Sequence, residues 1–262
     1  MKVAVISLRE SLGKSHLIAT LASLYSRSQN RSVGIMSTGN IKDNVDLVDI
    51  KVKDDALVNT KLFRAQIIAA TSADKSLLDG GLRQGDEDVF IFNIMDATLT
   101  ENQQIEFFKD CIKKVPVDFC IIEICGDLNS PINKAVIESV DCFLVLTDVS
   151  LKGFEKVKEY SETIPVQLQM RTGYILSKYD ANVVSEKKIY KTTKLNSSET
   201  MIWPYSSTIA KLGYDGLINE SAQKIMRGSD GNLIPIRERL MEMLRFIFNS
   251  DDRKIIREVN KW

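Results

Sequence analysis

Short apolar runs alternate with longer amphipathic segments along this chain, and this order constrains its fold more than any other feature. Residues 3–6 form an uninterrupted apolar run, which is typical of a strand buried on both faces of a parallel sheet. Residues 14–28 then place Leu17, Leu21 and Tyr25 at helical spacing. The alternation continues through strand candidates at 33–36, 89–92, 119–124, 142–146, 173–176 and 201–203 and helix candidates at 62–70, 103–114, 132–140, 154–163 and 236–248. It predicts an α/β fold with a doubly wound, mostly parallel sheet and helices on both faces.

The domain organisation follows from what interrupts this order. Residues 45–52 alternate apolar and polar side chains and read as a half-exposed strand, whereas the glycine-containing segment 72–88 reads as a surface loop. No low-complexity linker or internal repeat divides the chain. We therefore expect one domain over residues 1–250, followed by an amphipathic tail at 251–262.

Composition excludes several classes of protein. The 35 Lys and Arg residues balance 35 Asp and Glu residues, which argues against a uniformly basic nucleic-acid coat and against an acidic disordered chain. No run of about 18 apolar residues or secretory signal is visible. His16 is the single histidine, so a histidine metal site or a Ser-His-Asp triad is not expected. The four cysteines form no Cys-x-x-Cys pair, and we expect reduced thiols in a cytoplasmic protein.

A phosphate-binding loop is predicted directly after the first strand candidate. Gly13, Lys14 and Ser15 lie between that strand and a helix, the context in which backbone N–H groups and a helix N-terminus cradle phosphate oxygens. Lys14 would reach the terminal phosphates and Ser15 would hold Mg²⁺. The usual first glycine of such a loop is Leu8 here. A strand–helix turn with the same three letters by chance is the alternative.

The segment Arg9-Glu10-Ser11-Leu12-Gly13-Lys14-Ser15 resembles the deviant loop KGGxGK[ST] of the ParA/MinD ATPases, which belong to the SIMIBI class of P-loop NTPases. The resemblance implies ATP and Mg²⁺ as cofactors. Arg9 stands where the family has a lysine that crosses the dimer interface to the partner's nucleotide, and Glu10 replaces a glycine. The implied nucleotide-binding residues of this loop are Ser11, Leu12, Gly13, Lys14, Ser15 and His16, although we expect a structural role for the imidazole of His16.

Two strand ends are similar to the family's acidic motifs, with departures. Residues 118–127 resemble the strand that ends in a Walker B aspartate, but Glu123 occupies its place. The resemblance implies that Lys14, Arg9 and Glu123 are catalytic and that Ser15 and Glu123 hold the metal, with Asp127 as a second candidate. Glu123 is equally compatible with a carboxylate that marks the solvent end of a strand.

The second strand candidate ends in Ser37-Thr38-Gly39, where the family has Asp-x-Asp. Because the first of those carboxylates helps to position the attacking water, its loss predicts slow or absent hydrolysis. Nothing in the sequence selects a substitute among Asp43, Asp46 and Asp49.

The remaining nucleotide contacts are implied near the adenine base. Ser177 and Lys178 stand where the family has an Asn-Lys or Asn-Arg pair, with serine in place of the asparagine. Pro204 and Tyr205 resemble the family's proline-centred loop. Altogether the resemblance covers residues 1–250 and depends on the order of elements more than on exact motif letters.

Two basic surfaces carry alternative interpretations. The apolar residues of the tail, from Ile255 to Trp262, fall on one helical face with a basic remainder, as in the C-terminal membrane helices of MinD-like proteins. Such a helix would place the protein at the inner face of the membrane, whereas the alternative is a helix that docks on the domain. A lysine stripe would meet DNA phosphate or acidic lipid, or form a solvated face; it comprises Lys187, Lys188, Lys191 and Lys194.

Two functions are consistent with these features. The first is a ParA/MinD-like ATP-binding protein that acts as a nucleotide-dependent dimeric switch, positioning DNA, a pilus or secretion apparatus, or a division complex through a protein hub. The second is a degenerate, non-hydrolysing dimeric localisation scaffold, as in the TadZ-like pilus-localisation proteins. The ATPase activity would be weak in the first and absent in the second. A ligase of the dethiobiotin-synthetase type lacks an obvious second-substrate site.

Overall fold

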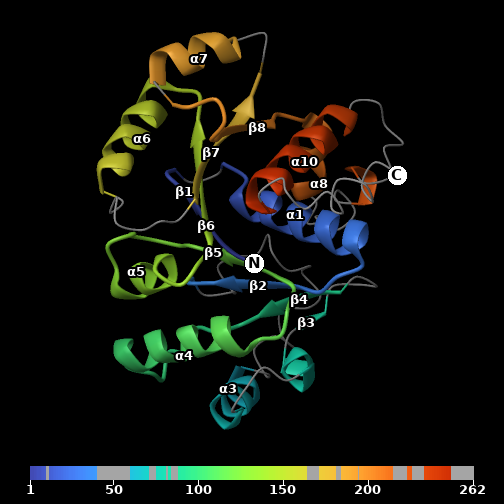
Figure 1. Ribbon diagram of the computed structural model, residues 1–262, viewed down its shortest axis with the longest axis vertical. Coiled ribbons are helices and arrows are strands. Elements are labelled where there is room, and N and C mark those ends of the chain that lie inside the picture. The colour runs from blue at the N-terminus through green and yellow to red at the C-terminus, as the bar shows by residue number, and fades with distance from the viewer. Residues whose placement is uncertain are drawn as a thin grey trace.

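Within the part of the chain that the structure describes, eight strands form one sheet in the order β3-β4-β2-β5-β1-β6-β7-β8 (Figure 1). The computed structural model describes residues 1–9, 12–39, 60–70, 75–80, 82–83, 88–163, 171–180, 184–193, 195–214, 223–225 and 233–248. The strands are β1 (Lys2–Ser7), β2 (Val33–Ser37), β3 (Leu82–Arg83), β4 (Val89–Phe92), β5 (Phe119–Glu123), β6 (Cys142–Asp148), β7 (Arg171–Tyr179) and β8 (Thr200–Pro204). All neighbouring strands pair in parallel except β3, which is antiparallel to β4. The predicted doubly wound, mostly parallel sheet is confirmed.

Helices cover both faces of this sheet (Figure 1). On one face lie α1 (Lys14–Gln29), α8 (Ser207–Tyr214) and α10 (Ile234–Phe248), and on the other lie α4 (Glu101–Lys114), α5 (Pro131–Ile137) and α6 (Leu151–Thr163). Two more helices, α3 (Thr60–Ala69) and α7 (Glu186–Thr193), lie beyond α4 and beside α6 respectively. None of the helices described is long and apolar enough to cross a bilayer.

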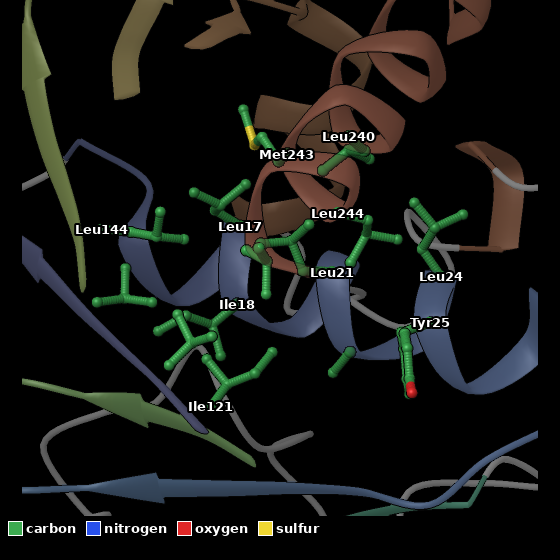
Figure 2. Close-up of a cluster of buried hydrophobic side chains, with 14 of the residues drawn as sticks. Leu17, Ile18, Leu21, Leu24, Tyr25, Ile121, Leu144, Leu240, Met243 and Leu244 are labelled. Atoms are coloured by element: carbon green, nitrogen blue, oxygen red, sulfur yellow. The ribbon is translucent and has the colours of Figure 1, made fainter. Parts of the chain in front are cut away.

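The uninterrupted apolar strands follow from this two-sided burial. In β1, Val3 and Val5 belong to the core beneath α1 and α10, whereas Ala4 and Ile6 belong to the core beneath α4 and α5. Figure 2 shows the first core, in which leucines of α1 meet those of α10 above the sheet. Because successive side chains of a strand point to opposite faces, a central strand needs apolar residues at every position.

Several element boundaries differ from those predicted. Within 72–88, expected to be a loop, Lys75–Gly80 form a 3-10 helix and Leu82–Arg83 form β3. The helix expected from 103 begins at Glu101, because Thr100 and Gln103 form a capping box. The helix expected from 154 begins at Leu151. The segment 45–52 and the tail 251–262 lie outside the described residues.

The four cysteines are free thiols, as expected. Burial raises the pKa of the Cys120 and Cys142 thiols to about 12, which keeps them protonated and unreactive. Cys111 is buried as well. Cys125, in contrast, is half-buried at the end of β5, where the candidate site begins.

Candidate nucleotide site

The loop after β1 returns to the sheet at the N-terminus of α1. The backbone N–H of Leu8 donates to the carbonyl of Leu146 at 2.9 Å, which extends the pairing of β1 with β6. Gly13 precedes α1 in a left-handed conformation, with φ 79°, which glycine adopts without the strain that a side chain would bring. It forms no side-chain cap, and the first turn of α1 has no acidic residue. The positive end of the helix therefore points to the carboxyl edge of the sheet, where ligands of such folds bind.

Lys14, Ser15 and Glu123 meet at this helix end. The Ser15 hydroxyl donates to Glu123 Oε1 at 2.8 Å, and Lys14 Nζ lies 3.5 Å from the same oxygen. Lys14 Nζ also donates to the carbonyl of Ile124 at 2.6 Å. The loop lysine and serine predicted to bind phosphate and metal thus lie beside the predicted acidic residue of β5. The sheet brings them together because β1 and β5 are parallel neighbours whose carboxyl ends share one edge.

The Glu123 carboxylate is buried, with 1% of its side chain exposed, while the Lys14 side chain is 17% exposed. A buried carboxylate is tolerated only where opposite charge and hydrogen bonds compensate the lost hydration. Here Lys14, Ser15 and the dipole of α1 supply that compensation, and the Ser37 hydroxyl donates to Glu123 Oε2 at 3.4 Å. Glu123 is therefore buried within a set of polar contacts and is not exposed to solvent at the end of its strand.

The donor set at this point suits Mg²⁺. A serine hydroxyl and a carboxylate are the oxygen ligands that Mg²⁺ accepts in nucleotide sites. Ser15 Oγ and Glu123 Oε1 are 2.8 Å apart, and neighbouring ligands of a magnesium octahedron are ~2.9 Å apart for bonds of ~2.0–2.1 Å. Within the described residues, no group of three or more His, Cys, Asp or Glu side chains forms a separate metal site. Ser15 and Glu123 are thus able to hold the ion together with phosphate oxygens and water.

The end of β2 carries the hydroxyl groups of Ser37 and Thr38 in the segment where the ParA/MinD ATPases have Asp-x-Asp. Thr38 Oγ1 accepts from the N–H of Cys125 at 2.9 Å, and the N–H of Thr38 donates to the carbonyl of Glu123 at 2.9 Å. The N–H of Gly39 donates to Ser37 Oγ at 3.1 Å. The two bonds of Thr38 tie the end of β2 to the end of β5, whereas the bond of Gly39 lies within the end of β2. The substitutes considered from sequence, Asp43, Asp46 and Asp49, lie outside the described residues.

Arg9 lies on the opposite side of β1 from Lys14. Its guanidinium donates to Asp148 Oδ2 and lies 3.5 Å from Ser150 Oγ, both at the end of β6. Sequence reasoning missed Asp148, because no sequence spacing links it to Arg9, which lies 139 residues away. Glu10 and Ser11 of the same loop lie outside the described residues.

The residues predicted near the base lie at the ends of β7 and β8. The buried Ser177 hydroxyl donates to the carbonyl of Leu12 at 2.5 Å, so it fastens the phosphate loop to β7. Lys178 is exposed in a left-handed conformation, with φ 56°. Pro204 is half-buried at the end of β8, and Tyr205 is exposed beside it.

Trp203 lies beside Gly13 of the loop. Its indole Nε1 lies 3.8 Å from the position that a Cβ atom on Gly13 would occupy. The side chain is buried at the carboxyl end of β8. Any movement of Gly13 therefore changes the surroundings of this indole ring.

The loop after β5 is held by Asn133 of α5. The buried Asn133 amide donates to the carbonyls of Cys125 at 2.9 Å and of Asp127 at 2.7 Å. The exposed Asp127 carboxylate accepts from the N–H of Asn129 at 2.9 Å, within its own turn. The Asp127 carboxylate therefore bonds within its own turn, whereas Ser15 bonds to Glu123. His16 lies in the first turn of α1, and its carbonyl accepts from the Thr20 hydroxyl.

The two predicted basic surfaces are described in part. Lys187, Lys188 and Lys191 are exposed on α7, and the buried Ile189 anchors that helix. Lys194 and the tail 251–262 lie outside the described residues. The lysine stripe and the tail thus stay predictions as binding surfaces.

Comparisons with known proteins identify the fold. No family model matches the sequence, and no curated protein matches it. Among solved structures, the chain is similar to a ParA family ATPase from Chlorobium tepidum TLS, with TM-score 0.65 and 15% identity over 91% of this chain and 96% of that one. It is also similar to the septum site-determining protein MinD from Pyrococcus horikoshii OT3 complexed with Mg-ADP, with TM-score 0.63 and 13% identity over 97% and 96%. A plasmid partition protein from Borrelia burgdorferi gives TM-score 0.57 and 12% identity over 85% and 98%. The fold is that of the ParA/MinD-type P-loop ATPases.

Proposed function

We propose that this chain is an ATP-binding protein that acts as a nucleotide-dependent dimeric switch in positioning or partition. The observation that carries the proposal is the meeting of Lys14, Ser15 and Glu123 at the uncapped N-terminus of α1. A cation, a hydroxyl and a carboxylate at a helix N-terminus are the groups that a Mg²⁺-bound polyphosphate needs. The similarity to ParA and MinD structures supports the same interpretation.

Each residue has a defined part in this proposal. The backbone of Gly13 and the first turn of α1 bind phosphate oxygens, and Lys14 turns from the Ile124 carbonyl toward the terminal phosphates. Ser15 and Glu123 hold Mg²⁺, which neutralises charge on the phosphate oxygens when it is bound. Arg9 reaches the nucleotide of a second subunit, so that ATP stabilises a face-to-face homodimer.

A second function is favoured by the end of β2. The Ser37 hydroxyl donates to Glu123, and the Thr38 hydroxyl accepts from the N–H of Cys125. Neither residue supplies the carboxylate that would orient an attacking water molecule. Without such a group the dimer would form and persist with little or no hydrolysis. The chain would then be a non-hydrolysing localisation scaffold.

The partners belong to the proposal as well. The neighbours include plasmid partition and cell-division proteins, one of them MinD in complex with MinC. By analogy, we expect this chain to work in the cytoplasm with a protein hub. The exposed lysines of α7 and the tail are its candidate contacts with DNA or membrane.

A Mg²⁺-ATP titration tests both functions. The sequence has two tryptophans, so a Trp262→Phe variant leaves Trp203, beside Gly13, as the single fluorescent reporter of the loop. Phosphate release and molecular mass by light scattering are followed on the same samples. The matched control is Lys14→Ala combined with Glu123→Gln. This double variant removes the lysine that would bind phosphate without leaving a buried negative charge unpaired.

The outcomes separate the functions. Saturable binding with nucleotide-dependent dimerisation and turnover supports the switch. Binding to a dimer of constant mass without turnover supports the scaffold. No binding by the parent variant, or equal binding by the control, would overturn both.

A further inference from the structure

The two cations of the phosphate loop point to opposite sides of β1. Lys14 reaches the end of β5, where it contacts Glu123 and Ile124, whereas Arg9 reaches the end of β6. Since the sheet order is β5-β1-β6, the Arg9 guanidinium is drawn away from the Lys14 side of the loop. The proposed function needs Arg9 at the nucleotide of a second subunit, so its contact with Asp148 in its own subunit competes with dimerisation.

Asp148 is built to receive Arg9. Its Oδ1 accepts from the N–H of Ser150 at 3.0 Å and from the Ser150 hydroxyl, which leaves Oδ2 directed at Arg9. Ser150 is itself fixed, because its hydroxyl accepts from the N–H of Gly153 at 3.0 Å and caps the first turn of α6. The Asp148 carboxylate therefore has a set orientation before Arg9 binds it.

Gly153 provides the space for this arrangement. A Cβ atom there would lie 2.7 Å from the carbonyl oxygen of Asp148 and 2.8 Å from Thr147 Oγ1, both closer than van der Waals contact allows. The loop backbone is held from the same side, since Lys156 Nζ of α6 donates to the carbonyl of Leu8 at 3.2 Å. The start of α6 thus fixes both the carboxylate and the backbone next to Arg9.

We propose that Asp148 is a positioning residue that holds Arg9 within its own subunit, and that pairing of two subunits requires this contact to break. The proposal rests on the nucleotide-dependent dimerisation proposed above. Asp148 then sets the nucleotide and protein concentrations at which the dimer forms, without contacting the nucleotide itself. Arg9 pairs either with Asp148 of its own subunit or with the nucleotide of the partner subunit.

The Arg9–Asp148 contact is strong enough to shift the monomer–dimer equilibrium and weak enough to break when two subunits pair. The Arg9 side chain is 44% exposed and that of Asp148 is 19% exposed. Ion pairs with this exposure are screened by water and salt. Two such contacts break when a symmetric dimer forms, so releasing Arg9 should tighten nucleotide-dependent dimerisation about fivefold, which corresponds to about 0.5 kcal/mol for each pair.

The test compares Asp148→Asn with wild type in the full chain. Asparagine keeps the shape and the contacts to Ser150 but loses the charge that attracts Arg9. Asp141→Asn is the matched control, because Asp141 precedes the same strand at the opposite edge of the sheet and accepts from the N–H of Lys2. Sedimentation gives the dimer dissociation constant with Mg²⁺ and a non-hydrolysable ATP analogue. In the Trp262→Phe background, at protein concentrations below that constant, Trp203 fluorescence gives the affinity of the monomer for the analogue.

The expected result is a split between the two measurements. Asp148→Asn lowers the dimer dissociation constant about fivefold, leaves monomer affinity unchanged, and has no effect on dimerisation when Arg9 is replaced by alanine. If wild type dimerises and Asp148→Asn has the same or a weaker constant, the positioning role is overturned while the proposed function stands. If wild type stays monomeric but Asp148→Asn dimerises, the positioning role is supported. If neither dimerises, both proposals fail.

Discussion

At the scale of single residues, Lys14 contributes to the stability of the fold as well as being a predicted phosphate ligand. It lies 3.5 Å from a carboxylate that is almost completely buried. Removing one partner of a buried pair leaves an uncompensated charge, which costs about 3–5 kcal/mol, whereas removing both costs far less. We therefore predict that Lys14→Ala lowers the free energy of unfolding by about 3 kcal/mol and that adding Glu123→Gln restores most of it.

Urea unfolding without nucleotide checks this prediction as a double-mutant cycle. Lys109→Ala is the control, because Lys109 forms an exposed pair with Glu106 and should change stability by less than about 0.5 kcal/mol. Additive effects of Lys14→Ala and Glu123→Gln would contradict a coupled pair. Coupling would mean that lost ATP binding in Lys14→Ala alone reflects damage to the fold as much as a missing phosphate contact.

The sequence allowed some of these residues to be predicted and not others. Lys14, Ser15 and Glu123 each follow a predicted strand or open a predicted helix, and parallel strands bring such positions to one edge. The direct bonds of Glu123 to Ser15 and Ser37 depend on side-chain geometry across 108 and 86 residues of chain. Asp148 was missed because its role depends on Ser150, Gly153 and Arg9 together, a combination that no spacing rule describes.

At the scale of elements, β7 supports the phosphate loop through one hydrogen bond. Ser177 donates to the carbonyl of Leu12, which precedes Gly13 and α1. Ser177→Ala leaves this acceptor without its partner in a buried position, which costs about 1–3 kcal/mol. We predict lower stability and weaker nucleotide binding for this variant, since the loop before Gly13 loses its attachment to the sheet.

A matched serine tests whether the effect is local. Ser139 donates to the carbonyl of Ala135 at the end of α5, away from the loop. Ser139→Ala should affect unfolding alone and leave the response of Trp203 to nucleotide as in wild type. Equal loss of nucleotide binding in the two variants would show that β7 has no special role in supporting the loop.

Element boundaries show where sequence patterns lose information. The apolar spacing located α4 and α6 correctly but placed their starts two and three residues late, because the capping residues Thr100 and Ser150 precede the apolar stripe. Short helices are harder still. The pattern gave no sign of α8, and it showed α7 only as a lysine stripe if helical.

At the scale of the whole molecule, the alternation of strands and helices was sufficient to predict the sheet. Two-sided burial demands apolar residues at successive central positions of β1, β5 and β6, and few other architectures produce that pattern. The strand order was beyond prediction, because it depends on contacts between distant segments. One such contact joins the starts of β2 and β5, where the Asp118 carboxylate accepts from Arg31 at 2.8 Å and from the Ser32 hydroxyl at 3.0 Å.

This contact and a second one at Asp96 predict how the molecule responds to acid. Partial burial opposes ionisation of Asp118, but the bonds from Arg31 and Ser32 outweigh it and lower its pKa. The bonds from Thr98, aided by Arg64 of α3, lower the pKa of Asp96. A carboxyl group whose pKa is lower in the folded than in the unfolded chain stabilises the fold fully above its unfolded pKa, near 3.8, and loses that effect as the pH falls through its folded pKa.

The free energy of unfolding should therefore fall below about pH 4, and less steeply in Asp118→Asn and Asp96→Asn than in wild type. Urea unfolding from pH 6 to pH 2.5 measures how steeply the free energy of unfolding changes with pH in each protein. Ser139→Ala is the control, since it removes a hydrogen bond but no carboxyl group, and its stability should fall with acid as steeply as that of wild type. Because Asp118 joins segments 86 residues apart, its protonation weakens the pairing of β2 with β5 on which the Ser37–Glu123 contact depends. Wild-type slopes in both variants would show that neither carboxylate links protonation to the stability of the sheet.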